Sequence, residues 1–345
     1  MRERSGPSAK IMFIAYLQVI AIILVVLYHS FHEYPGGNFG FDLWGMRLLA
    51  TLRMPIFLFI SGYLMVITTR RKNPGWGEYA VKKVKRLMIP FLTLSIVTFI
   101  PRSMMSSIAD EQIVLSPESL LGSLTRSGKM VIPFFWYLQA SLVLLCGTYL
   151  FTLLARRLIV APVAVYLLFF FIFLAVRAAD IVDTDFFSLH GIFRYGANFF
   201  LGAAYACLPA DKDRLIPWTS PLFTVGAAIL WVVCFILFEG HPYLYELATI
   251  ASFLTFISLT KILEERKIGI LDRFVGANYM IFLLSWYFNI LSQQLLHHFI
   301  PSLPWQLCSA LSLLLGVGCP LMMYKYLQCH KHSRWGKITS FLLGQ

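Results

Sequence analysis

The sequence predicts an all-α protein, a polytopic membrane helix bundle with about ten transmembrane helices. Three observations lead to this prediction. Hydrophobic residues make up 58% of the 345 residues and charged residues only 13%. Mean hydropathy is +0.72, which is typical of integral membrane proteins. Lysine and arginine lie at alternate ends of the apolar runs, as expected for cytoplasmic loops.

The predicted spans are apolar runs of about 17 to 25 residues, the length needed to cross a bilayer. We expect a single integral-membrane domain over residues 1–345, because the longest outer loop, about 102–130, is too short to fold by itself. The spans are 11–31, 44–68, 87–101, 131–154, 158–177, 187–208, 218–238, 243–261, 278–298 and 304–327.

The formal net charge of +12 comes mainly from loops that fall on one side of the predicted bundle. Basic residues concentrate in the N-terminus, the 70–86 loop, the 261–273 loop and the tail after residue 324. The opposite loops are acidic, with Glu33, Asp42, Asp110, Glu111, Asp180, Asp183, Asp185 and Glu239. This pattern predicts a multi-pass protein of the inner cell membrane with both termini cytoplasmic, and it argues against nucleic acid as a partner.

Neither the cysteines nor the histidines of the tail predict a metal site. The six cysteines are scattered, mostly inside apolar runs, and His330 and His332 have no carboxylate nearby. The first apolar run is longer than the core of a signal peptide and has no small-residue cleavage site after it, so we expect it to remain as the first span.

His29 is the first candidate for chemistry, because it lies at the end of the first span, in the outer half of the membrane. A neutral imidazole can act as a general base near neutral pH. If the helix continues by one turn, Glu33 lies four residues on and could orient the ring. The alternative is a histidine bonded to headgroups at the membrane interface.

The second span carries Arg47 and Arg53, which lie on different faces, so at most one of them shares a site with His29. A guanidinium in an apolar segment must be paired or line a wet cavity, where it suits phosphate or an acyl oxyanion. Pro55 is expected to kink this helix. Ser61 and Gly62 then offer a small surface for a ligand or for helix packing.

Lys83 and Arg86 are three residues apart and share a helical face at the start of the third span. This face is suited to a nucleotide phosphate or to the 3'-phosphate of coenzyme A, and the alternative is a positive-inside anchor.

Aromatic and polar residues further along the chain are candidates for binding a sugar acceptor. Trp136 and Tyr137 open the fourth span and form either a membrane aromatic belt or a platform for a sugar ring. Arg194 and Asn198 in the sixth span suit either a polar acceptor or a structural pair with the acidic loop before them.

Several motifs in this order resemble the acyltransferase 3 family of membrane acyltransferases, which O-acylate sugars of surface glycans and other acceptors. The resemblance spans nearly the whole chain and is strongest over the first three helices. The motifs are Val25-Val26-Leu27-Tyr28-His29, Arg53-Met54-Pro55 through Ser61-Gly62-Tyr63, Lys83-x-x-Arg86 leading to Ile89-Pro90, Trp136-Tyr137-Leu138 and Gly276-Ala277-Asn278.

The resemblance implies that His29 is the catalytic base and that Lys83 and Arg86 bind acyl-CoA. The chain departs from the family pattern at three places. Gln18 stands where the family has an arginine eleven residues before the histidine, Lys83 replaces the first arginine of the third-helix pair, and Ser285 stands where many members have a histidine.

We therefore expect a membrane O-acyltransferase that moves an acetyl group from cytoplasmic acyl-CoA, its donor substrate, to a hydroxyl of a carbohydrate acceptor. No bound cofactor or metal is expected, the lipid bilayer is a partner, and a homo-oligomer is left open. The expected site residues are His29 and Arg53 for catalysis, Lys83, Arg86, Gln18 and Ser61 for acyl-CoA, and Trp136, Tyr137, Arg194 and Asn198 for the acceptor. The alternatives are a transporter or flippase for a glycan or acyl group, and a sensor or scaffold with the enzyme's fold.

Overall fold

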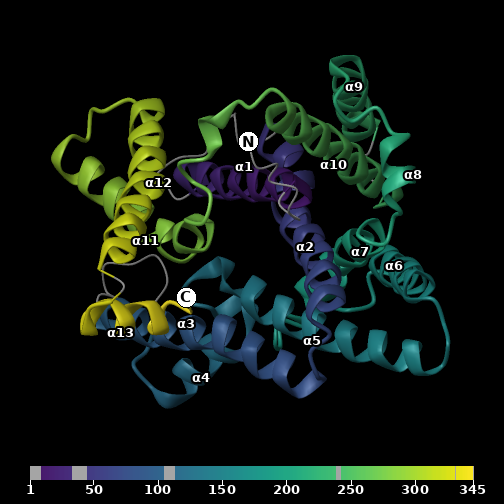
Figure 1. Ribbon diagram of the computed structural model, residues 1–345. Helices are drawn as coiled ribbons and strands as arrows, with labels where there is room; N and C mark the ends of the chain where they lie inside the picture. Colours follow the sequence, from purple (N-terminus) through teal and green to yellow (C-terminus); the bar gives the residue numbers. More distant parts are fainter. Residues whose placement is uncertain (1–8, 33–44, 105–112, 238–241, 331, 345) are drawn as a thin grey trace. The chain divides into compact units, whose positions relative to one another are not determined.

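The computed structural model describes residues 9–32, 45–104, 113–237, 242–330 and 332–344 (Figure 1). These residues form thirteen α-helices and a few short 3-10 turns. Within these ranges there is no strand, and Arg126 and Phe186 form one isolated β-bridge. The prediction of an all-α fold is confirmed.

Ten of the helices have at least 17 residues, and each overlaps one predicted span. They are α1 (Ala9–His32), α2 (Gly45–Lys72), α3 (Trp76–Met104), α5 (Trp136–Arg157), α6 (Pro162–Ala179), α7 (Leu189–Tyr205), α9 (Pro221–Leu237), α10 (Pro242–Glu265), α11 (Asn278–Phe299) and α12 (Trp305–Cys329). The short helices are α4 (Pro117–Thr125), α8 (Ala210–Arg214) and α13 (Arg334–Leu342).

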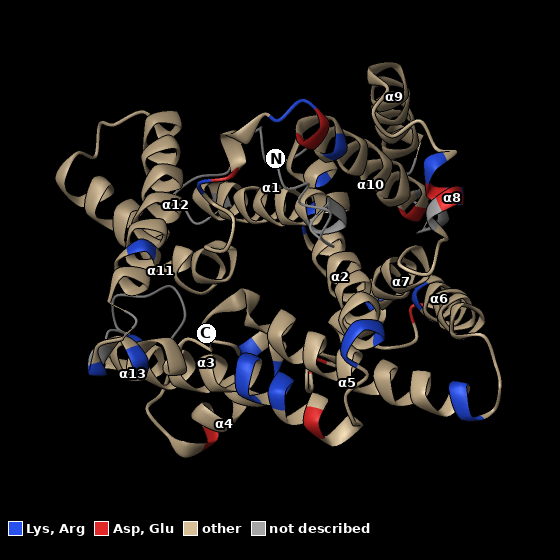
Figure 2. Cartoon of the chain, viewed as in Figure 1, with Lys and Arg blue, Asp and Glu red and all other residues tan. Residues whose placement is uncertain are grey.

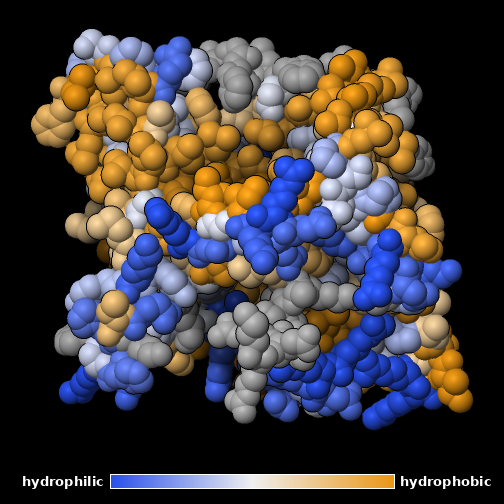
Figure 3. Space-filling view, turned by 45° about the horizontal axis from the view of Figure 1, so that its top comes forward, coloured by the Kyte–Doolittle hydropathy of each residue, from blue (hydrophilic) through white to orange (hydrophobic). Residues whose placement is uncertain are grey.

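Seven helices in the described part of the chain are long and apolar enough to cross a membrane, namely α1, α2, α3, α5, α6, α10 and α12. Helix α9 is apolar but shorter. Helix α11 is long enough, but polar side chains along it lower its mean hydropathy. Wide areas of hydrophobic side chains reach the surface on the face seen in Figure 3. The chain is therefore a polytopic helical membrane protein, with seven of the ten predicted spans meeting both criteria.

The third helix begins eleven residues before its predicted span, so the expected 70–86 loop is wrong. Only residues 73–75 connect α2 and α3, at the turn that the Asn73-Pro74-Gly75 sequence predicts. The basic run 82–86 is therefore helical, and Figure 2 shows basic residues along α3. Lysine and arginine are good helix formers, so a basic run is compatible with helix as well as with a loop.

The chain divides into two compact units, each built from separate stretches of sequence. The first unit comprises residues 1–57 and 208–329, and the second comprises residues 58–207 and 330–345. In the first, α1 packs against α10, α11 and α12, and α9 packs against α10. In the second, α6 packs against α7, and α5 and α13 pack against α3. Helix α2 contributes its first part to one unit and its second part to the other.

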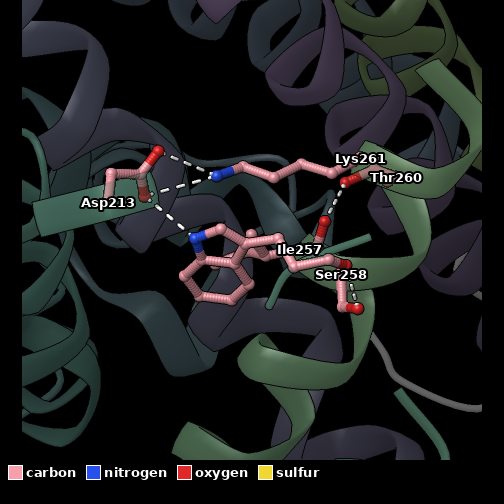
Figure 4. Close-up of polar contacts among 6 residues, drawn as sticks. Asp213, Ile257, Ser258, Thr260 and Lys261 are labelled. Carbon is pink, nitrogen blue, oxygen red and sulfur yellow. Dashed lines mark hydrogen bonds and ion pairs between the residues drawn. The ribbon is translucent and has the colours of Figure 1, made fainter. Parts of the chain in front are cut away.

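An ion pair fastens the short helix α8 to α10 in the first unit (Figure 4). Lys261 Nζ lies 3.0 Å from Asp213 Oδ2, and Trp218 Nε1 donates to Asp213 Oδ1 at 3.0 Å. The ammonium of Lys261 also lies 4.6 Å from the centre of the Trp218 ring. Both charged side chains are largely buried, so losing one of them would leave the other poorly solvated.

Glycines let two helices cross at backbone contact in the second unit. An ideal Cβ on Gly62 of α2 would lie 1.9 Å from the carbonyl oxygen of Phe199 on α7. A Cβ on Gly202 of α7 would lie 1.9 Å from the carbonyl oxygen of Phe59 on α2. The predicted role of Gly62 in close helix packing therefore has a direct structural counterpart.

Candidate active site

The predicted site residues divide between the two units. His29, Arg53 and Gln18 belong to the first unit. Lys83 and Arg86, with Ser61 and the predicted acceptor-binding residues Trp136, Tyr137, Arg194 and Asn198, belong to the second.

In the first unit, the ring of Tyr28 joins Arg53 to His29. The guanidinium carbon of Arg53 lies 3.3 Å from the centre of the Tyr28 ring. The same ring meets the half-buried His29 imidazole edge to face, with centroids 5.2 Å apart. A cation, a phenol and an imidazole therefore form one contiguous group at the end of α1.

The guanidinium of Arg53 has hydrogen-bonding capacity to spare. Its Nε and Nη1 atoms are buried and have no hydrogen-bond partner among the described residues. A buried cation is costly unless it is paired or faces a polar ligand. Arg47, the other arginine considered from sequence, is exposed. Arg53 is therefore the one suited to bind an anion or a carbonyl oxygen next to His29.

Helix α11 holds the last turns of α1 through side-chain amides. Gln293 Nε2 donates to the carbonyl oxygens of His29 at 3.2 Å and of Ser30 at 2.8 Å. Asn289 Nδ2 donates to the carbonyl oxygen of Val26 at 3.3 Å. The last four carbonyls of a helix have no partner within it, so Gln293 satisfies two groups that would otherwise be costly to bury. The backbone that carries His29 is fixed in this way.

We expect Gln293→Met to reduce turnover at this site by about tenfold, because the methionine keeps the length of the side chain and loses the donor that holds the backbone of His29. The KM for the substrate should stay unchanged. The control is Gln294→Met on the exposed neighbouring position. Equal turnover by the two variants would remove Gln293 from this role.

Gln18 pairs with another amide in the same unit. Asn278 Nδ2 donates to Gln18 Oε1 over 3.4 Å. Asn278 is the first residue of α11 and follows Gly276, whose φ of +89° is in the left-handed region that favours glycine. The Gly276-Ala277-Asn278 turn before a helix is thus present. A neutral amide pair occupies the place where the family pattern has an arginine, and Gln18 lies in the first unit while Lys83 and Arg86 lie in the second.

In the second unit, aromatic packing positions Lys83 of α3. The Lys83 ammonium lies 5.2 Å from the centre of the Tyr79 ring, and Tyr79 packs on Tyr149 with centroids 4.6 Å apart. The Tyr149 hydroxyl donates to the carbonyl oxygen of Pro74 at 2.5 Å. Lys83 is half-buried on this platform, whereas Arg86, one turn further along, is exposed. Both remain on one face of the helix, as the spacing predicts.

Ser61 and Tyr137 bond to each other across α2 and α5. Their oxygens are 2.9 Å apart. Beside them Trp136 stacks on Tyr195 of α7, with ring centroids 5.5 Å apart, and a Cβ on Gly191 would lie 2.6 Å from the Trp136 ring. Ser61 was predicted to contact the donor and Tyr137 the acceptor, yet the two share one hydrogen bond. The indole of Trp136 packs on a ring of its own unit.

Asn198 is fully buried at 0% exposure, and neither atom of its amide has a hydrogen-bond partner among the described residues. On α7 it follows Tyr195 by three residues and precedes Gly202 by four, so it shares the face that meets α5 and α2. Its amide therefore lies on the face of α7 that packs against both helices. Arg194, four residues before Asn198, is exposed, and its guanidinium carbon lies 5.6 Å from the centre of the Tyr195 ring.

Sequence reasoning gave no role to several residues that shape these groups. Tyr28 was seen only as part of a motif, and Asn289 was passed over, although its spacing of four from Gln293 indicates a shared helical face. Glu33, the predicted partner of His29, lies outside the described residues, as do Asp42, Asp110, Glu111 and Glu239. The described residues hold no group of three His, Cys, Asp or Glu side chains placed to bind a metal ion.

Comparison with known proteins identifies the family of the chain. The acyltransferase 3 family model, described as an acyltransferase domain, matches residues 12–323, which is nearly the whole chain and includes most of both units. Comparisons with curated proteins and with solved structures gave no match. The family match covers His29, the arginines of α2 and the basic pair of α3. The chain therefore belongs to the acyltransferase 3 family, and it is a membrane acyltransferase.

Proposed function

We propose that the protein is an O-acyltransferase of the inner cell membrane, with both termini cytoplasmic. It takes an acetyl group from acyl-CoA on the cytoplasmic side and transfers it to a hydroxyl of a sugar or surface glycan. The family supports acyl transfer, and the distribution of basic residues supports the orientation.

In this proposal His29 is the general base. Its imidazole accepts the proton of the acceptor hydroxyl while the oxygen attacks the thioester carbonyl carbon. The carbon–sulfur bond of the tetrahedral intermediate then breaks, and the imidazolium returns the proton to the thiolate of coenzyme A. The products are an oxygen ester and a free thiol, so no other reactant is needed.

The single observation that carries the proposal is that the Tyr28 ring contacts both His29 and Arg53, an arginine with two buried N–H groups that have no partner among the described residues. Arg53 Nε and Nη1 have no hydrogen-bond partner among the described residues, and Arg53 reaches His29 through the Tyr28 ring. An oxyanion that forms next to the imidazole would accept hydrogen bonds from these N–H groups. A donor of this kind is worth about 3 kcal/mol in the transition state.

Lys83 and Arg86 are the proposed binding groups for the phosphates of acyl-CoA. We expect Lys83→Gln and Arg86→Gln each to raise the KM for acyl-CoA by about tenfold, because a charged hydrogen bond to phosphate is lost, while kcat stays nearly unchanged. The matched control is Lys85→Gln, which removes one exposed charge from the same run on another face of α3. Acyl-CoA binding that is indifferent to all three changes would place the donor site elsewhere.

Asn198 is the proposed contact for the acceptor, because a buried amide without partners suits a hydroxyl-rich ligand. We expect Asn198→Leu to raise the KM for the acceptor tenfold or more and to leave the melting temperature equal or higher. The unbound protein loses only a buried polar group that is not hydrogen-bonded. A lower melting temperature with an unchanged KM would show that Asn198 has a structural role.

Acetyl transfer by the purified protein in proteoliposomes tests the proposed function. The wild-type protein should form an ester on a glycan hydroxyl and release free thiol from acetyl-CoA. A transporter or flippase would move its substrate without releasing thiol, and a sensor or scaffold would do neither. The absence of both products with several glycan acceptors would contradict the proposal.

A further inference from the structure

The chain continues past its last candidate span into a short helix with defined ends. Helix α12, one of the seven candidate membrane spans, ends at Cys329, and α13 begins at Arg334. Ser333 caps α13, because its side-chain oxygen accepts a hydrogen bond from the Gly336 N–H at 3.0 Å. The segment is thus a capped helix that follows a candidate membrane span in the sequence.

One side of α13 is fixed to α3. Helix α13 contacts α3, and the chain after the helix touches α3 closely at Gly344, whose φ of +68° favours glycine. A Cβ on Gly344 would lie 2.4 Å from the carbonyl oxygen of Arg86. The helix therefore lies beside the basic run 82–86, within the second unit.

The other side of α13 carries two bases followed by apolar residues. Arg334, Lys337, Ile338 and Phe341 follow the spacing that places residues on one helical face, and all four are exposed. Ile338 is 43% exposed and Phe341 is 57% exposed. Residues 330–345 contain no Asp or Glu, and Lys82, Lys85 and Arg86 on α3 are exposed as well. The surface is strongly basic, and Ile338 and Phe341 form its apolar edge.

From this arrangement we propose that α13 is an interfacial helix that binds anionic phospholipids. A helix with bases and exposed apolar side chains lies in the plane of a membrane, with its apolar edge among the acyl chains and its bases at the headgroups. Clusters of basic residues next to a membrane span bind anionic lipid in the same way. The lipid surface matches both parts of the face, whereas an acidic protein partner would leave Ile338 and Phe341 uncovered.

The experiment measures amide hydrogen exchange of residues 334–342 in the full-length protein, reconstituted in phosphatidylcholine with and without phosphatidylglycerol. We expect exchange to slow when phosphatidylglycerol is present and to quicken again at high salt. The double variant Arg334→Gln/Lys337→Gln should reduce the affinity for phosphatidylglycerol by about 30-fold, since each base near the surface contributes about fivefold. The control Arg157→Gln/Lys212→Gln removes two exposed charges elsewhere, and exchange in this variant should still slow when phosphatidylglycerol is present.

A second variant tests the apolar edge separately. Ile338→Ser/Phe341→Ser should weaken protection in both lipid mixtures, because it removes insertion and leaves the bases in place. Exchange that is the same in both mixtures for the wild-type protein would overturn the proposal. Protection that rises with protein density in place of phosphatidylglycerol content would also overturn it and would assign the face to a second copy of the chain.

Discussion

His29→Ala is expected to reduce acyl transfer by about a hundredfold to ten-thousandfold, the range that a positioned general base contributes. The substitution removes the only group in the Arg53–Tyr28–His29 cluster that can accept a proton near neutral pH. Membrane insertion should be unchanged, since alanine is tolerated in an apolar helix. The measurement is ester formation in membranes that contain equal amounts of the two proteins.

Two further observations separate this loss from general damage. Acyl-CoA should still bind to His29→Ala, because the proposed phosphate contacts lie on α3. The control is His298→Ala at the exposed end of α11, which also removes one imidazole and should leave transfer unaffected. Transfer that persists in His29→Ala would reject the assignment of the base.

Gly202→Val is expected to lower the stability of the second unit by several kcal/mol, more than a typical overpacking change, because the obstacle is backbone. The new Cβ would lie 1.9 Å from the Phe59 carbonyl oxygen, and no side chain can rotate to make room. Helices α2 and α7 would have to separate, which would also disturb Gly62 on the opposite side of the crossing. Gly62→Val should have the same effect for the same reason.

The matched control for the crossing is Gly147→Ala on α5. A Cβ there would meet nothing within 4 Å, so this change should be neutral or slightly stabilising. The measurement is the melting temperature in detergent, with folded yield as a second value. If Gly202→Val and Gly147→Ala had the same melting temperature, the close approach of α2 and α7 would be disproved.

The sequence predicts the fold well because each membrane helix leaves a local signal. Apolar runs of the right length mark ten long helices, and the Asn73-Pro74-Gly75 turn lies where its residues favour one. The predicted start of α3 is eleven residues too late, because hydropathy marks the apolar part of a helix and not its polar first turns. The basic turns at 82–86 continue the helix as a polar extension. The partition into two units follows from contacts between distant segments, which local patterns do not contain.

The candidate site is predictable in its parts and not in its connections. His29 and Arg53 stand out because ionisable residues in apolar segments are costly. Three contacts join residues on different helices or faces. They are the contact of Arg53 with the Tyr28 ring, the hydrogen bond from Gln293 to the end of α1, and the hydrogen bond between Ser61 and Tyr137. These depend on how the helices rotate against each other. The lack of partners around Asn198 is likewise a property of the packed helices.

The most direct test of the central claim is a single-turnover experiment with purified protein and acetyl-CoA labelled in its acetyl group. Ester formed on a glycan hydroxyl and free thiol released are measured in the same samples. The proposed mechanism predicts equal amounts of ester and thiol in the wild-type protein, and neither in His29→Ala, although that variant still binds the donor. Thiol release without ester, or ester formation that does not require His29, would contradict it.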